Sequence, residues 1–201
     1  MAVSSHSYLF VGLGNPGISY EHTRHNIGFR VLDALVDAHY GSDWQTQCKG
    51  LMTILTWPEV GKIHLLKPQT FMNLSGQSVQ QALQFYKIPL ENLLVIHDDI
   101  DLSPFVVRSK KGGSDGGHRG LMSITAHLSN AYERLRLGVG RPNHRDAVSA
   151  YVLSRFSPEE EEKVNVLCNA FTHTIKLWPT QRTKFATSLR TALAKEGLSP
   201  S

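Results

Sequence analysis

Histidines, asparagines and a run of acids are the residues of this chain whose types and spacing could do chemistry. The stretch 12–28, GLGNPGISYEHTRHNIG, follows an apolar run and combines glycines, a proline and an asparagine with titratable side chains. In α/β proteins, loops of this kind at strand ends carry the chemistry. His25 lies near the end of this loop, just before an amphipathic run, and we take it as the centre of the candidate site. A structural turn with a surface histidine would explain this stretch alone equally well.

The same loop contains GLGNPG, which matches the G-x-G-x-x-G fingerprint of dinucleotide-binding proteins. That fingerprint requires a helix that opens inside the glycines, so that the pyrophosphate lies on the helix N-terminus. Here Pro16 and Gly17 are followed by polar residues, and the first helical pattern starts only near Asn26. Asp33, the acid that should end a second strand, falls inside that helix. The sequence therefore disfavours a nucleotide cofactor.

The acidic run His97-Asp98-Asp99-Ile100-Asp101 has the composition of a metal site. In an extended segment, however, consecutive side chains point to opposite sides, so these residues cannot all meet one ion. With no HxH or HExxH motif elsewhere, we predict no metal site. One carboxylate that orients a histidine is the simpler hypothesis, and Asp98 is the first acid after the apolar run. A solvated or helix-capping aspartate is the alternative.

The remaining side chains favour attack by water over covalent catalysis. No serine lies in a G-x-S-x-G elbow, and neither cysteine lies in a candidate loop. A histidine, a carboxylate and the neutral amides of Asn15 and Asn73 suit a general-base mechanism. The carboxylate would fix the histidine tautomer, and the amides would donate to a developing oxyanion. Met72 and Phe71 would form an apolar wall, although plain core packing is the more common role of such a phenylalanine.

The elements that must position these residues alternate between strand and helix patterns. We expect strands at 8–11, 51–57, 62–67, 93–97, 105–109 and 133–139, and helices at 26–40, from Ser75, at 118–128, from Ser157-Pro158 and at 183–195. Ser75 and Ser157 are the predicted N-caps, segment 110–117 is expected to be mobile, and segment 146–153 has no clear type. From about residue 190 onward we expect a flexible tail. The pattern predicts one α/β domain over residues 1–201, with a twisted mixed β-sheet flanked by helices on both faces.

Composition sets the class of protein. The 201 residues are 41% hydrophobic and 19% charged, with a net charge of +4 and a pI of about 9.1. This mild basic excess permits a polyanionic partner without requiring one. Two cysteines without a CxxC spacing give no support to a disulfide framework or a zinc knuckle. The sequence shows no signal-peptide pattern and no apolar run of about 18 residues, so we expect a cytoplasmic protein without a membrane segment.

Several motifs in series carry a family resemblance. GLGNPG, TRHNIG, PQTFMNLSG, VIHDDIDL, KKGGSDGGHRGL and RLRLGVGRP occur in this order between about Tyr8 and Leu189. Together they resemble bacterial peptidyl-tRNA hydrolase. The resemblance implies hydrolysis of the ester between a peptide and the 3′ ribose of tRNA, which recycles tRNA from aborted translation. It also implies a monomer that needs no cofactor or metal and no obligate protein partner.

The resemblance also assigns roles to individual residues. It implies that His25 is the catalytic histidine and Asp98 its partner, while Asn15 and Asn73 position the substrate. Further residues match positions of the family's substrate cleft; these are Tyr20, Met72 and His118.

The family usually has GGHNG where this chain has Gly116-Gly117-His118-Arg119-Gly120. The family asparagine is associated with holding the substrate end and the attacking water. Arg119 only donates hydrogen bonds, so it cannot accept one from water. We expect it to bind substrate differently, through a phosphate near the 3′ end of tRNA. The departure also keeps a second hypothesis open: an RNA-binding relative without hydrolase activity, like a chloroplast splicing factor that resembles the family.

Basic residues flank the glycine-rich loop on both sides. Sequence-independent RNA binding needs phosphate contacts from such groups, although scattered cations are more often a solvated surface. The resemblance implies that Arg108 and Lys110 face the tRNA backbone, and we add Arg136 to this set. Arg134 and Arg136 alternate with leucines, which predicts that they share one face of the sheet.

Overall fold

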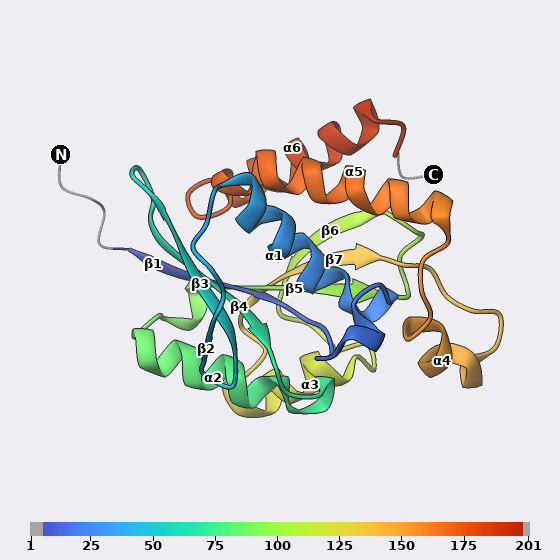
Figure 1. Cartoon of the computed structure of the whole chain (residues 1–201), viewed down its shortest axis with the longest axis horizontal. Coiled ribbons are helices and arrows are strands. Elements are labelled where there is room, and N and C mark those ends of the chain that lie inside the picture. Colours follow the sequence, from blue (N-terminus) through green and yellow to red (C-terminus); the bar gives the residue numbers. More distant parts are fainter. Residues whose placement is uncertain (1–5, 199–201) are drawn as a thin grey trace.

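A seven-stranded mixed sheet forms the centre of the molecule in the computed structural model, which describes residues 6–198 (Figure 1). The strand order is β2-β3-β4-β1-β5-β7-β6. The strands are β1 (Ser7–Gly12), β2 (Gln45–Gln47), β3 (Gly50–Trp57), β4 (Gly61–Pro68), β5 (Leu93–Asp99), β6 (Val107–Lys111) and β7 (Glu133–Gly138). Strands β4, β1, β5 and β7 run parallel, so their carboxyl ends meet at one edge. Antiparallel strands extend the sheet on both sides.

Helices cover both faces of this sheet. They are α1 (Ile27–Ala38), α2 (Ser75–Tyr86), α3 (Arg119–Leu128), α4 (Val148–Val152), α5 (Pro158–Thr174) and α6 (Arg182–Lys195). Figure 1 shows α1, α5 and α6 on one face, α2 and α3 on the other, and α4 beside the edge where the parallel strands end. The predicted α/β fold with a mixed sheet is confirmed.

Side-chain alternation along the strands fills two separate cores. Phe10 and Ile96 point toward the layer of α1, α5 and α6, whereas Val11 and Val95 point toward α2 and α3. The loop after β1 can pass close to α1 because Gly12 lacks a side chain: a Cβ there would lie 2.2 Å from the Gly28 carbonyl oxygen. This close approach brings the segment that carries His25 against the end of β5.

The predicted elements agree with the structure in most places. The hairpin of β3 and β4 is present, α1 begins only at Ile27 beyond the glycines, and Ser157 forms the predicted capping box with Glu160. The untyped segment 146–153 contains the short helix α4. Along the described chain, no helix is both long and apolar enough to cross a membrane.

Three predictions are wrong in detail. Ser75 does not cap α2: a 3₁₀ helix, Met72–Leu74, leads into it, and the Ser75 hydroxyl donates to the Met72 carbonyl instead. Lys110 and Lys111 belong to β6 rather than to a mobile loop, since the strand starts and ends two residues later than expected. The tail prediction fails for residues 190–195, because α6 continues to Lys195 and buries Leu193. Residues 199–201 of the predicted tail lie outside the described residues.

Candidate active site

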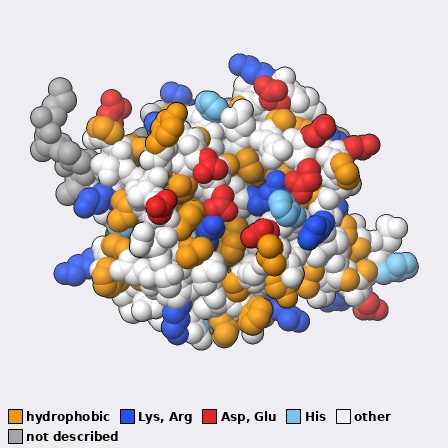
Figure 2. Space-filling view, viewed as in Figure 1, with side chains coloured by type: hydrophobic (Ala, Val, Ile, Leu, Met, Phe, Trp, Pro, Cys, Tyr) orange, Lys and Arg blue, Asp and Glu red, His pale blue; other side chains and the backbone are white. Residues whose placement is uncertain are grey.

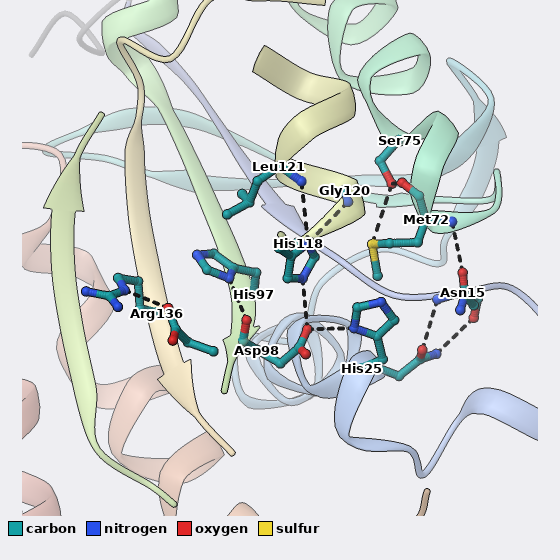
Figure 3. A network of polar contacts seen from close by, with 12 residues as sticks. Asn15, His25, Met72, Ser75, His97, Asp98, His118, Gly120, Leu121 and Arg136 are labelled. Carbon is teal, nitrogen blue, oxygen red and sulfur yellow. Dashed lines mark hydrogen bonds and ion pairs between the residues drawn. The ribbon is translucent and has the colours of Figure 1, made fainter. Parts of the chain in front are cut away.

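His25 meets Asp98 at the edge where the parallel strands end. His25 lies in a 3₁₀ helix, Arg24–Asn26, directly before α1, and Asp98 is the penultimate residue of β5. The His25 Nδ1 atom is 2.9 Å from the Asp98 Oδ1 atom (Figure 3). The Asp98 side chain is only 2% exposed, because β5 lies in the middle of the sheet between β1 and β7. The structure thus brings together the histidine and the carboxylate that the sequence singled out.

His118 reaches the same carboxylate oxygen from α3. Its Nε2 atom lies 3.0 Å from Asp98 Oδ1, while its Nδ1 atom accepts hydrogen bonds from the backbone N–H groups of Gly120 and Leu121. His118 is therefore the N-cap of α3, and its proton must be on Nε2 when the ring is neutral. With the His25 proton on Nδ1 facing Asp98, the Nε2 atom of His25 keeps a free lone pair. This is the tautomer that a general base needs.

The electrostatics of this cluster follow from burial and from the pairing of charges. Burial opposes ionisation of Asp98, yet the adjacent His25 and His118 hold the pKa of this carboxyl well below its usual range. For His25, burial lowers the pKa, but Asp98 outweighs it, so the net pKa is raised above 6.5; Arg119 weakly opposes this rise. Asp98 thus stays ionised and stabilises the imidazolium form of His25.

His97 has a different environment on the same strand. It is fully enclosed, its Nδ1 atom lies 2.7 Å from the Asp98 carbonyl oxygen, and burial together with His118 lowers its pKa to about 3. His97 is therefore neutral at physiological pH and serves to pack behind His118, whose ring centroid lies 5.1 Å away.

Asn15 is locked in place by its neighbours. Its backbone N–H donates to Asn26 Oδ1 and its carbonyl accepts from Asn26 Nδ2, both at 2.9 Å. Its own side-chain Oδ1 accepts from the Met72 N–H, also at 2.9 Å (Figure 3). This arrangement fixes the amide orientation and leaves the Asn15 Nδ2 group as a donor for a ligand. Asn73, in contrast, is exposed and makes no side-chain hydrogen bond within residues 6–198.

These side chains line a cleft of about 780 Å³. Of the residues predicted from the sequence, the cleft wall includes Asn15, His25, Met72, Asn73, Asp98, Lys110, His118, Arg119 and Arg136. Two predicted residues are not part of it. Tyr20 lies in the 3₁₀ helix Ile18–Tyr20, where its carbonyl accepts from the Thr23 hydroxyl, and Arg108 is exposed on β6. Val148 and Val152 of α4, together with Leu153, form an apolar part of the cleft wall.

The basic residues near the cleft fall into two groups. In the ladder of β6 and β7, Arg108 lies opposite Arg136 and Lys110 opposite Arg134, so all four side chains share one face, as expected for the two arginines of β7. Arg134 is buried and bonded to Asp115 and to the Ser114 carbonyl, and Arg136 pairs with Asp99 at 2.7 Å.

The second group has no anionic partner among the residues that the structure describes. Lys110, Arg119 and Arg145 line the cleft, are exposed, and form no ion pair there. Asp146 also lines the cleft, and it too has no ion-pair partner within residues 6–198. On the face of the molecule in Figure 2, acidic, basic and apolar side chains are interspersed. Three free cations against one free acid make the cleft suitable for an anionic ligand.

A metal ion is the other ligand that the cluster could hold. His25, Asp98 and His118 each offer one ligand atom, and these atoms lie within 4.8 Å of one another. Both histidine contacts to Asp98, however, have the length of N–H···O hydrogen bonds, and a metal would have to displace those two protons. The geometry therefore describes a proton-transfer site more fully than a metal site.

Sequence reasoning missed three contributors. Asn26, which clamps Asn15, was assigned only to the start of a helix, although it stands next to His25 in the same motif. Asp99, the partner of Arg136, was grouped with the other acids. Arg145 had no local pattern that could identify it, because its place in the cleft depends on how the chain after β7 returns to the sheet.

Comparisons with known proteins point to one family. The family model described as peptidyl-tRNA hydrolase matches residues 9–196. A peptidyl-tRNA hydrolase from Sulfurovum sp. (strain NBC37-1) is 51% identical over 162 residues, covering 79% of this chain and 82% of that protein. One from Methylobacterium sp. (strain 4-46) is 44% identical over 192 residues, covering 94% and 93%. The crystal structure of peptidyl-tRNA hydrolase from Acinetobacter baumannii has a TM-score of 0.85 and 34% identity, covering 94% of this chain and 97% of that one.

Proposed function

Because this chain belongs to the peptidyl-tRNA hydrolase family, whose members hydrolyse the ester bond of peptidyl-tRNA, we propose that His25 activates the attacking water. The ester hydrolysis itself follows from the family. The assignment of the general base rests on one observation: the contact of 2.9 Å between His25 Nδ1 and a fully buried Asp98, which leaves Nε2 of His25 unprotonated and facing the cleft.

The reaction needs two proton transfers at this Nε2 atom. It first takes a proton from water as the water oxygen bonds to the ester carbonyl carbon. The resulting imidazolium, stabilised by Asp98, then gives the proton to the 3′ oxygen of the ribose as the ester C–O bond breaks. Free peptide and tRNA result, and His25 returns to its starting state. His118 holds the Asp98 oxygen in place throughout, through its Nε2–H.

The amides of Asn15 and Asn73 position the substrate. Asn15 Nδ2 is a preoriented donor, because the backbone and side-chain oxygen of this residue are already bonded. A fixed neutral donor can bind the ester carbonyl oxygen and stabilise the oxyanion that develops on it. Asn73 is free to bind the peptide or the ribose. Met72 forms an apolar surface next to them, and its Sδ atom fits against Gly120, where a Cβ would lie only 2.6 Å away.

The free cations of the cleft bind the tRNA end. Lys110 and Arg119 extend from β6 and from the start of α3, and neither needs to break an ion pair to contact a phosphate. Arg108 continues this surface along β6. Arg136 contributes while remaining paired with Asp99, so its contact with phosphate is weaker. Tyr20 lies outside the cleft wall, so in this proposal it contacts only a peptide that extends beyond the cleft.

The binding-only alternative has one observation in its favour, which is the presence of Arg119 where the family has asparagine. The complete set of His25, Asp98, Asn15 and Asn73 favours the enzyme. Because the substrate arises in translation, we place the activity in the cytoplasm. We also expect the purified chain to sediment as a monomer and to work without a protein partner or cofactor.

A cleavage assay tests this proposal. Purified protein should release free tRNA from peptidyl-tRNA and leave aminoacyl-tRNA, the control substrate, largely intact. Tight binding of peptidyl-tRNA without cleavage would support the alternative instead.

A further inference from the structure

Arg24 stands directly before His25 and is almost completely buried at 8% exposure. Its guanidinium group donates from Nη2 to Glu160 Oε2 at 2.6 Å and from Nη1 to the Ser154 hydroxyl at 2.9 Å. It also lies over the rings of Tyr151 and Phe156, at 4.6 and 5.0 Å from their centroids. All of these partners come from the segment that contains and follows α4, more than 120 positions away in the sequence.

The backbone repeats this connection. The Arg24 N–H donates to the Ser154 carbonyl at 3.1 Å, and the Phe156 N–H donates to the His22 carbonyl at 3.4 Å. Between them, Thr23 pairs with Arg155 as an antiparallel bridge. The residues before His25 and the residues after α4 therefore form a short two-stranded contact, and the Arg24 side chain closes it from one side.

The segment held in this way is a wall of the active-site cleft. Val148, Val152 and Leu153 line the same cleft as His25, yet α4 is only five residues long and Val152 is its one buried residue. A further anchor of α4 is the hydrogen bond from the Tyr151 hydroxyl to the Val139 carbonyl at 2.6 Å. Because α4 is so short, its position depends strongly on these connections.

Glu160 connects the Arg24 contact to helix α5. Its carboxylate accepts the Ser157 N–H at 2.8 Å as part of the capping box, and the same oxygen, Oε2, accepts from Arg24. The position of the guanidinium is thus tied to the N-terminus of a 17-residue helix. Charge-assisted contacts of this geometry are stronger and more directional than neutral ones.

We propose that Arg24 is a positioning residue that holds the α4 wall of the cleft and His25 in one fixed relative position. The inference rests on the proposed hydrolysis by His25 and extends it: substrate that packs against α4 is aligned with Nε2 of His25 only while this contact is intact. A residue that merely stabilised the fold would change the fraction of folded protein and leave kcat of the folded fraction unchanged. A positioning residue changes kcat of fully folded protein.

Two neighbouring glutamates on α5 provide a matched pair of variants. Glu160→Gln removes the charge that Arg24 contacts but keeps an amide oxygen for the capping box, in which glutamine also functions. Glu161→Gln removes the partner of Arg30, an ion pair of 2.7 Å between α5 and α1; Glu161 also lies 3.9 Å from the exposed His22 Nδ1 atom, and it does not line the cleft. Both variants lose one charge from the same helical turn, so their effects on α5 are comparable.

The experiment measures kcat and KM for peptidyl-tRNA well below the Tm of each variant, together with hydrogen exchange of the backbone. We expect Glu160→Gln to lower kcat by about tenfold or more, in line with the cost of small misplacements of reacting groups. Exchange should become faster at residues 148–156. Glu161→Gln should stay within about twofold of the wild type. Arg24→Lys, which keeps the charge but not the two-armed geometry, should lower kcat as Glu160→Gln does.

The outcomes separate this inference from the proposed function. Equal kcat values for the two glutamine variants, or a deficit of Glu160→Gln that disappears on cooling further below its Tm, would overturn the positioning role alone. Failure of the wild type to cleave peptidyl-tRNA would overturn the proposed function, and the inference that rests on it.

Discussion

His25 and His118 contact the same oxygen atom of Asp98, at 2.9 and 3.0 Å, and their ring centroids lie 5.0 Å apart. The two rings have different tasks because only one of them has a free nitrogen toward the cleft. Both nitrogens of His118 are engaged, one by Asp98 and one by the start of α3, whereas His25 keeps Nε2 free. One carboxylate oxygen thus orients both the base, His25, and the second histidine, His118.

The pH dependence of the reaction follows from this cluster. His25 works as a base only when neutral, and its pKa is raised above 6.5 because Asp98 outweighs the effects of burial and of Arg119. We therefore expect kcat/KM to fall on the acid side of a midpoint above pH 6.5. Asp98→Asn removes the raising charge and should move this midpoint to lower pH, with a lower plateau. A midpoint that is the same in both proteins would assign the titration to another group.

Arg119 provides a second prediction, because it forms no ion pair within residues 6–198 and its charge acts on His25. Arg119→Asn should weaken tRNA binding and reduce the slope of log affinity against log salt by roughly one unit. Turnover should change modestly, and the acid midpoint should rise slightly, since Arg119 lowers the pKa of His25. An inactive wild type in which this substitution switches cleavage on would instead support the binding-only hypothesis.

Lys110 and Arg108 give a prediction about tRNA binding that is separate from the chemical step. Their replacement by alanine should raise KM for peptidyl-tRNA and reduce the salt slope, while cleavage of a short mimic of the tRNA end stays unchanged. Lys110 should have the larger effect, because it lines the cleft and Arg108 does not. The matched control is Lys184→Ala, because Lys184 lies on α6, which covers the face of the sheet opposite to α2 and α3. Equal salt slopes in the wild type and the double variant would remove both residues from the interface.

Much of this site could be predicted from the sequence because it lies at strand ends. The apolar run of β1 precedes Asn15 and His25, that of β4 precedes Asn73, and that of β5 precedes Asp98. Because these strands are parallel, their carboxyl ends meet at one edge of the sheet. Local patterns of glycine, proline and alternation were enough to find those ends.

The remaining contacts depend on pairs that are distant in the sequence. Arg24 and Glu160 are 136 positions apart, and no local pattern links them. Likewise, the sequence gives the number of cations but not that Arg136 pairs with Asp99 while Arg119 has no ion-pair partner in the described part of the chain. The error at Ser75 has a local cause: a serine before a helical pattern fits a cap, but here the backbone is already helical one turn earlier.

Chelation provides a further prediction. His25, Asp98 and His118 are close enough to hold a metal ion, yet their contacts are accounted for by hydrogen bonds. Activity should therefore be unchanged after extensive treatment with EDTA and removal of the chelator. Loss of activity that one added metal ion restores would show that this cluster is a metal centre.

The central claim is that His25 is the general base, and single-turnover cleavage of peptidyl-tRNA by the wild type and by His25→Ala tests it most directly. The variant must first show the circular dichroism, Tm and tRNA affinity of a folded protein. We predict that its cleavage rate is then lower by about 10² or more, the usual contribution of a general base. A folded His25→Ala variant that cleaves at nearly the wild-type rate would contradict the account.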